Sequence, residues 1–182
     1  TFGPATGSNW AEATHWSVWD AETDGNFLGG STLTTPTTNL VDGYVEYAIG
    51  ELDFTCGAQW GNDFRDSILN ALLRNTALVV AQAYFSLHSG DPGGTGANEL
   101  SGNNYGRVPM SFQSAEAKTA ESDAVANSPT ASGNWAQATY GGLWTLATGG
   151  SFIWGAQLTT ARTVLSGKFL RAAIAAWQVT VT

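Results

Sequence analysis

An internal repeat limits the possible folds of this chain more than any other feature of its sequence. Residues 4–55 align without a gap with residues 129–180 at a constant offset of 125 positions, and 19 of the 52 aligned residues are identical. Chance similarity between segments rich in threonine and glycine does not account for this match, because the rarer residues Pro4, Trp10 and Phe27 stay in register. A fixed period of this kind indicates that one structural unit occurs more than once.

The two copies differ in length. Residues 61–125 precede the shared segment of the second copy, whereas nothing comparable precedes that of the first. We therefore expect two domains, in which residues 1–58 are the C-terminal half of a first copy and residues 59–182 are a complete second copy. Half of a sheet domain leaves strand edges and an apolar face open. The rest of the first copy is then either missing upstream or supplied by another chain.

The composition favours short strands joined by many turns. Only 12% of the residues are charged, about half of the usual share, and 22 of the 182 residues are glycine. Short strands with frequent turns predict an all-β fold, namely a β-sandwich with jelly-roll or Greek-key connections and one short helix at the start of the second copy. The segments with strand character are residues 83–88, 105–112, 134–144, 152–158, 168–173 and 177–182.

The helix is predicted from its end signals and its apolar face. Asn62 and Asp63 can cap its N-terminus, and Asn75 can end it. Phe64 and Ile68 lie about one turn apart, as in an amphipathic helix.

The residue pattern also predicts how particular strands and turns are built. Every second residue from Ala83 onward is apolar within residues 83–88, which is the period of a half-buried strand. Pro109 places its strand at a sheet edge or a bulge. The glycine pair in residues 148–150 and the Asp-Gly pair in residues 23–25 predict two-residue hairpin turns at equivalent positions of the two copies.

The net charge of −8 is unevenly distributed along the chain. Nine acidic residues and no Lys or Arg precede Arg65, whereas seven basic and six acidic residues occur from Arg65 onward. An acidic front half is a poor match for a phosphate backbone, so no nucleic-acid partner is expected. No apolar run approaches the roughly 18–20 residues that cross a bilayer, and no signal peptide is present, so no membrane partner is expected either. The single cysteine, Cys56, cannot staple the fold.

The sequence offers little for catalysis. A nucleophile needs a base that is itself oriented, and the only histidines are His15 and His88. The other copy has Tyr140 at the position of His15, so the fold does not require histidine there. No Gly-x-Ser-x-Gly segment is present. We therefore expect no catalytic residues and no cofactor.

Two segments resemble calcium sites in composition. Residues 20–25 place acidic side chains at alternate positions before a glycine, as the opening of an EF-hand loop does. The twelfth position of that loop should be glutamate and is Ser31, and a hairpin turn explains the glycine without a metal. Residues 91–104 form a glycine-rich loop with acidic and amide side chains. The preference of these residue types for turns explains their presence more simply than a metal does. No metal site is predicted.

The tryptophans divide into shared and copy-specific positions. Trp16 and Trp154 are copy-specific, because Gly141 and Gly29 replace them in the other copy. Such positions are candidates for subunit contacts or for stacking against a glycan, whereas we expect the tryptophans shared by both copies to lie in a common core. Three basic residues of the second copy, which the first copy has lost or reversed in charge, are further contact candidates: Arg162, Lys168 and Arg171.

Residues 62–182 resemble a family of small virion proteins of tailed phages, often described as tail-fibre-like or decoration-like. The similar segments are residues 64–73, 84–92, 96–102, 105–108, 144–152 and 158–164, whereas residues 1–55 are similar to the latter half only. The most specific stretch runs from Leu87-His-Ser-Gly-Asp-Pro92 to Tyr105-Gly-Arg107. The resemblance implies self-assembling virion subunits without catalysis, commonly trimers.

We therefore predict a non-enzymatic structural protein of a tailed-phage virion, either a capsid decoration (cement) subunit or a fibre or spike subunit. Its expected partners are copies of itself, as a trimer, and other virion proteins such as a major capsid or tail protein. Its expected location is the virion, assembled in the host bacterial cytoplasm. The alternative is a carbohydrate-binding adsorption module that contacts a host surface glycan. Exposed copy-specific tryptophans would favour this alternative, and their burial between subunits would favour the structural role.

Overall fold

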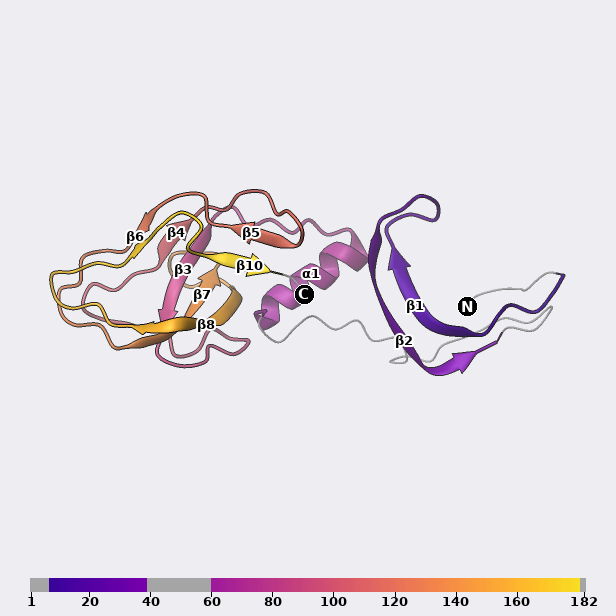
Figure 1. The fold of residues 1–182 in the computed structure, drawn as a ribbon, viewed down its shortest axis with the longest axis horizontal. Coiled ribbons are helices and arrows are strands. Elements are labelled where there is room, and N and C mark those ends of the chain that lie inside the picture. Colours follow the sequence, from indigo (N-terminus) through magenta and orange to yellow (C-terminus); the bar gives the residue numbers. More distant parts are fainter. Residues whose placement is uncertain (1–6, 39–59, 181–182) are drawn as a thin grey trace. The chain divides into compact units, whose positions relative to one another are not determined.

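The computed structural model describes residues 7–38 and 60–180 and divides the chain into two units, residues 1–56 and 57–182 (Figure 1). The described part of the first unit is an antiparallel hairpin of β1 (Ala13–Trp19) and β2 (Phe27–Thr37). The two units are connected through residues outside the described ranges.

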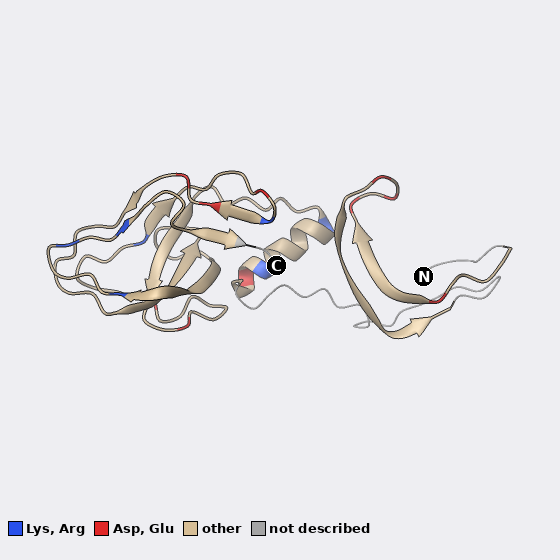
Figure 2. Cartoon of the chain, in the orientation of Figure 1, with Lys and Arg blue, Asp and Glu red and all other residues tan. Residues whose placement is uncertain are grey.

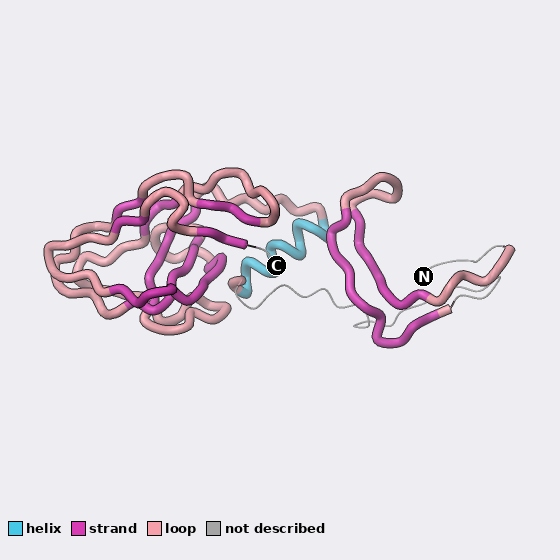
Figure 3. Tube along the Cα trace, in the orientation of Figure 1, coloured by secondary structure: helices cyan, strands magenta, loops and turns pink. Residues whose placement is uncertain are grey.

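The second unit contains one helix and eight strands among its described residues. Its central sheet has the strand order β4-β3-β7-β8, and the pairs β5/β10 and β6/β9 form separate two-stranded sheets. All of these pairings are antiparallel. Apart from α1, every element of the described residues is a strand, which confirms the predicted all-β class (Figure 3). The β-sandwich itself stays a prediction. The elements are α1 (Asn62–Arg74), β3 (Ala83–His88), β4 (Val108–Met110), β5 (Thr119–Glu121), β6 (Ala126–Asn127), β7 (Ala138–Trp144), β8 (Phe152–Arg162), β9 (Arg171–Ala172) and β10 (Gln178–Thr180).

The hairpins β1/β2 and β7/β8 have the same register at the offset of 125 positions. Trp19 pairs with Phe27, and Trp144 pairs with Phe152 in the same way. The register shifts also fall at equivalent positions, next to the first residue and next to the last residue of β1 and of β7. The aligned segments therefore form the same local structure wherever both are described, although their burial differs.

The loops of both hairpins are longer than the predicted two-residue turns. The amide of Asp20 donates to the carbonyl of Asn26 at 3.2 Å, and the amide of Thr145 donates to the carbonyl of Ser151 at 3.0 Å. In each loop the side-chain oxygen of the first residue accepts the amide hydrogen of the last, at 2.6 Å from Asn26 to Asp20 and at 2.9 Å from Ser151 to Thr145. These side-chain bonds close a wider loop, so the glycines shape its end without forming the whole turn.

Helix α1 forms where it was predicted, but its N-cap residue is Gly61, without a side-chain capping bond. Asn62 instead accepts a hydrogen bond from the guanidinium of Arg65. Asn75 ends the helix in the left-handed conformation, with φ of +52°, as the sequence predicted. No helix among the described residues has the length and apolar character needed to cross a membrane.

Strand β3 is buried on both faces at its C-terminal end, whereas its alternation predicted a half-buried strand. Phe85 and Leu87 belong to the hydrophobic core on one face, and Ser86 and His88 are buried on the other, with exposures of 1% and 0%. β3 lies between β4 and β7, and polar groups on its second face are covered by the following loop. Pro109 lies on β4 at the edge of the sheet, as predicted.

Candidate functional site

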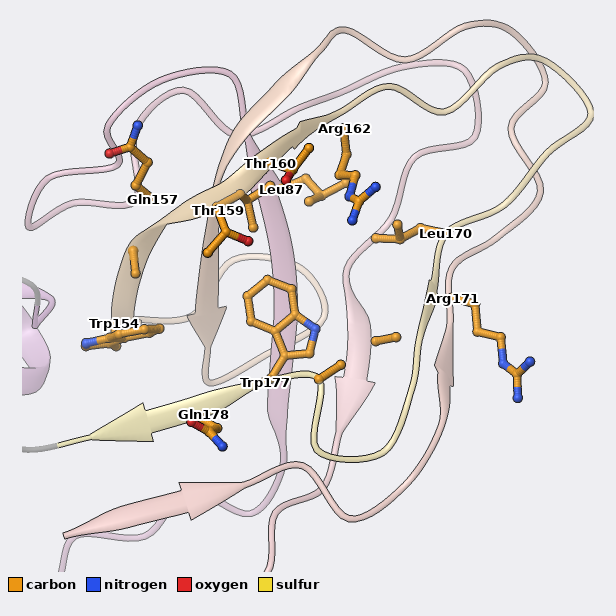
Figure 4. A pocket seen from close by; sticks show the side chains of 14 residues that line it. Leu87, Trp154, Gln157, Thr159, Thr160, Arg162, Leu170, Arg171, Trp177 and Gln178 are labelled. Carbon is orange, nitrogen blue, oxygen red and sulfur yellow. The ribbon is translucent and has the colours of Figure 1, made fainter.

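A groove of about 350 Å³ crosses the second unit beside β8 (Figure 4). We call it the aromatic groove. Figure 4 shows the indole of Trp177 in its centre, with Trp154 at one end and Arg162 toward the other. Its lining residues are Leu87, Trp154, Ala156, Gln157, Leu158, Thr159, Thr160, Arg162, Leu170, Arg171, Ala172, Ala176, Trp177 and Gln178.

The floor of the aromatic groove depends on Gly141, which has no side chain. The ring of Trp177 packs on that of Phe85, with centroids 4.2 Å apart. A Cβ atom at Gly141 would lie 2.7 Å from the Trp177 ring and 3.0 Å from the Phe85 ring, so only glycine leaves room for this pair. The first copy has Trp16 at the position of Gly141 and Leu52 at that of Trp177. The first copy therefore lacks both the glycine and the indole on which the floor of the groove depends.

The rim of the groove carries exposed polar side chains. Gln157 and Thr159 on β8 and Arg162 at its end are exposed, and Gln178 donates a hydrogen bond to Glu121. Arg171 lines the groove, but its guanidinium points away from Trp177 in Figure 4. Half-buried indole faces next to amide, hydroxyl and guanidinium groups can stack against a sugar ring or accept an apolar side chain of another protein.

The predicted contact residues divide between this groove and other surfaces. Trp154, Arg162 and Arg171 line the groove together. Lys168 is exposed outside its lining, and Trp16 lies half-buried on β1 of the first unit. Trp177 was not singled out from the sequence. The signal that could have identified it is the one that identified Trp154, a tryptophan present in only one copy.

A second cluster surrounds Arg107, and we call it the arginine clamp. Arg107 Nε and Nη2 donate to the two carboxylate oxygens of Glu99 at 2.9 and 2.8 Å. Nη1 donates to the carbonyl oxygens of Leu146 and Gly149 at 2.9 and 2.6 Å. The guanidinium carbon lies 3.6 Å from the ring centroid of Trp144. One side chain therefore ties the loop after β3 to the β7/β8 hairpin.

Ser86 and His88 have the spacing of a nucleophile and a base but no access to solvent. Ser86 Oγ lies 2.8 Å from His88 Nε2, and His88 Nδ1 lies 2.6 Å from the carbonyl oxygen of Ala97. Trp144 Nε1 donates to Ser86 Oγ at 3.0 Å. Burial lowers the pKa of His88, so its ring is neutral, donating through Nδ1 and accepting the Ser86 hydroxyl at Nε2. Every polar atom of the network is satisfied internally, which is the arrangement of a structural core.

The segments that resemble calcium sites use their polar groups in turns. Both carboxylate oxygens of Asp20 accept hydrogen bonds from Asn26, at 2.6 and 2.9 Å, and the side-chain bond in particular lowers the pKa of Asp20. In the longer loop, the carboxylate of Asp91 accepts the backbone amide hydrogen of Gly93 at 2.8 Å. The side-chain amide of Asn98 donates to the backbone carbonyl of Asp91 at 2.8 Å. Within residues 7–38 and 60–180, no group of three or more acidic, histidine or cysteine side chains is placed to hold a metal ion.

Comparison with known proteins identifies a family to which the chain is similar. A family model described as Podophage GP4 fiber I protein gp80 matches the chain in two segments, residues 1–55 and 59–182. No curated protein matches the chain.

Proposed function

The chain belongs to the family described as Podophage GP4 fiber I protein gp80, and on that premise we propose that it is a non-enzymatic, self-assembling fibre subunit of a phage particle. Membership of this family confirms the resemblance to structural proteins of tailed phages. The printed description names a fibre protein, so we favour a fibre or spike position over capsid decoration. The family match over nearly the whole chain is the observation that carries this proposal.

Three features of the molecule support a structural role. The Ser86–His88 pair, which has the distance of a catalytic pair, is closed to substrate by burial. The arginine clamp holds loops to the sheet and leaves no open position for chemistry. The equivalent hairpins support a domain plan in which residues 1–58 are half of a repeat and residues 59–182 are a complete repeat.

A cryo-electron microscopy map of the intact particle tests this proposal. We expect density for the second unit in an appendage of the particle, with copies of the chain in contact with one another and with a neighbouring virion protein. Density on the head lattice instead would overturn the fibre assignment in favour of decoration. Absence of the chain from purified particles, checked by mass spectrometry, would overturn the structural role altogether.

The aromatic groove supports a second candidate function, glycan binding during adsorption. Trp154 and Trp177 offer stacking surfaces, and exposed side chains such as Gln157 and Thr159 offer hydrogen bonds to hydroxyl groups. Titration of the chain with a panel of bacterial surface oligosaccharides, followed by tryptophan fluorescence, tests this function. We expect Trp154→Gly, which introduces the residue of the other copy, to weaken binding at least tenfold.

The matched control for this titration is Trp10→Gly, which removes a tryptophan that is 44% exposed in the first unit. Binding that survives Trp154→Gly, or that Trp10→Gly weakens equally, would remove the groove as the glycan site. A groove covered by a neighbouring subunit in the particle would favour the structural role for the same residues.

A further inference from the structure

The hairpin β7/β8 shows what its aromatic pair requires in this fold. Trp144 and Phe152 are 9% and 4% exposed, and their ring centroids lie 5.1 Å apart at an interplanar angle of 67°. Arg107 covers the indole, and the backbone at Gly96 lies so close that a Cβ atom there would overlap the Trp144 ring. In the second unit this aromatic pair is therefore covered by a cation and a close backbone segment.

The hairpin β1/β2 has the same pair without the same cover. Trp19 and Phe27 have ring centroids 5.4 Å apart at 69°, which is nearly the geometry of the buried pair. Their exposures are 53% and 59%. Two adjacent exposed aromatic side chains at a position that is buried elsewhere in the same molecule indicate an interaction surface.

The residues around Trp19 argue against the hypothesis that a strand equivalent to β3 covers the Trp19–Phe27 pair. In the second unit, a Cβ atom at Gly142 would lie 2.8 Å from His88 Nε2 and 2.7 Å from the Phe152 ring. The first copy has Ser17 at this position, so its side chain occupies the space that His88 requires. Trp19 Nε1 donates to Ser17 Oγ at 3.0 Å, within its own strand, whereas Trp144 depends on the neighbouring strand. The indole N–H of Trp19 is therefore already bonded, and the exposed part of this side chain is its aromatic surface.

The loop beside Trp19 carries negative charge, which would attract a cation. In the first copy, acidic residues occupy three loop positions: Asp20, Glu22 and Asp24 stand where the second copy has Thr145, Ala147 and Gly149. In the second unit the same loop accepts two hydrogen bonds from Arg107 through backbone carbonyls alone. Figure 2 shows acidic segments and no basic segment in the described part of the first unit. A guanidinium or ammonium group placed over Trp19 would therefore meet the ring face and carboxylates together.

The second unit carries exposed basic residues whose charge is complementary to that of this loop. Arg162 and Arg171 line one groove, and Lys168 lies between them in the chain, exposed and outside the lining of that groove. Leu165 and Phe169 are 55% and 53% exposed in the same segment. The corresponding positions of the three basic residues in the first copy are Thr37, Gly43 and Glu46, so the two copies have diverged toward opposite charge.

We propose that the acidic hairpin of one copy of this chain binds the basic patch of a second copy, with a cationic side chain over Trp19 as Arg107 lies over Trp144. The acidic hairpin is the surface of Trp19, Asp20, Glu22, Asp24 and Phe27. The basic patch is the segment from Arg162 to Arg171, which also carries the exposed Leu165, Lys168 and Phe169. This contact joins two different surfaces, so it repeats from copy to copy and builds a ring or an extended fibre. The inference rests on the proposed function as a self-assembling fibre subunit and specifies the surfaces that assemble.

Sedimentation velocity of the full chain tests the proposal. Reversal of the basic patch by Arg162→Glu, Lys168→Glu and Arg171→Glu should weaken self-association at least tenfold at low salt. The pair Glu22→Lys and Asp24→Asn should do the same from the other side, and it leaves Asp20 in place because that residue closes the loop. Association of the parent chain should also weaken in 1 M salt, where the Debye length falls to about 3 Å. A mixture of the two variant proteins should recover association, because each retains one surface and the altered surfaces attract.

The matched controls are Glu12→Lys and Arg74→Glu, which reverse exposed charges outside both surfaces and should leave association unchanged within twofold. Far-ultraviolet circular dichroism of each variant checks that the fold is retained. A parent chain that stays monomeric at all concentrations would overturn the proposal, as would variants that associate like the parent. A chain that is found in the particle but stays monomeric in solution would overturn this inference alone, whereas its absence from the particle would overturn the proposed function.

Discussion

Replacing Arg107 with methionine should destabilise the second unit by about 3–4 kcal/mol. Removing one partner of a buried ion pair costs about 3–5 kcal/mol, and the partial exposure of Glu99, whose side chain is 20% exposed, reduces this to about 2–3 kcal/mol. Loss of the cation–π contact over Trp144 adds about 1 kcal/mol. The carbonyl groups of Leu146 and Gly149 lie in an exposed loop where water can replace the guanidinium, so they add little.

Urea unfolding of the full chain, followed by tryptophan fluorescence, measures this loss as a shift of the transition of the second unit. Arg171→Met is the matched control, because its side chain is exposed, and it should change stability by no more than about 0.5 kcal/mol. The double variant with Glu99→Gln should be more stable than the sum of the two single losses predicts, with a coupling of about 1 kcal/mol or more. A loss below about 1 kcal/mol for Arg107→Met, or strictly additive losses, would refute the reasoning.

Two further perturbations test the core around Trp144. Burial lowers the pKa of His88 in the folded chain, so the unfolded chain takes up a proton first as the pH falls. The neutral His88 ring therefore contributes its full share of stability above about pH 6.5, the ordinary pKa of histidine. This share is lost as the pH falls toward the pKa of the folded state. His88→Gln should therefore lose less stability than the parent between pH 7.5 and pH 5 in urea unfolding, and an equal loss would contradict a buried neutral histidine. Gly96→Ala should cost more than about 2 kcal/mol, because φ is +73° and the new Cβ would overlap the Trp144 ring, whereas Gly102→Ala, with φ of +77° and open space, should cost about 1 kcal/mol. Equal losses for the two glycine variants, measured by the same unfolding experiment, would argue against the tight packing at Gly96.

Local features of the sequence were sufficient to predict much of the secondary structure. The end of α1 at Asn75 follows from the ease with which asparagine adopts the left-handed conformation, and the edge position of β4 follows from the missing amide of Pro109. The aligned copies allowed Trp154 to be singled out before any contact was known. Loop length was less predictable, because side-chain bonds from Asp20 and Thr145 compete with the preferred two-residue turn.

The sequence by itself determined the all-β class, the position of the helix and the equivalence of the two hairpins, because these depend on residue periodicity and on interactions between neighbours along the chain. Only the tertiary structure decided that Ser86 and His88 are buried, since alternation reports one covered face of a strand and not a loop that closes over the other. It also decided the role of Arg107, whose partners Glu99 and Gly149 lie 8 and 42 positions away in the sequence. The same applies to the exposed Trp19, which differs from the buried Trp144 through the distant residues that reach it, although the two hairpins share one register.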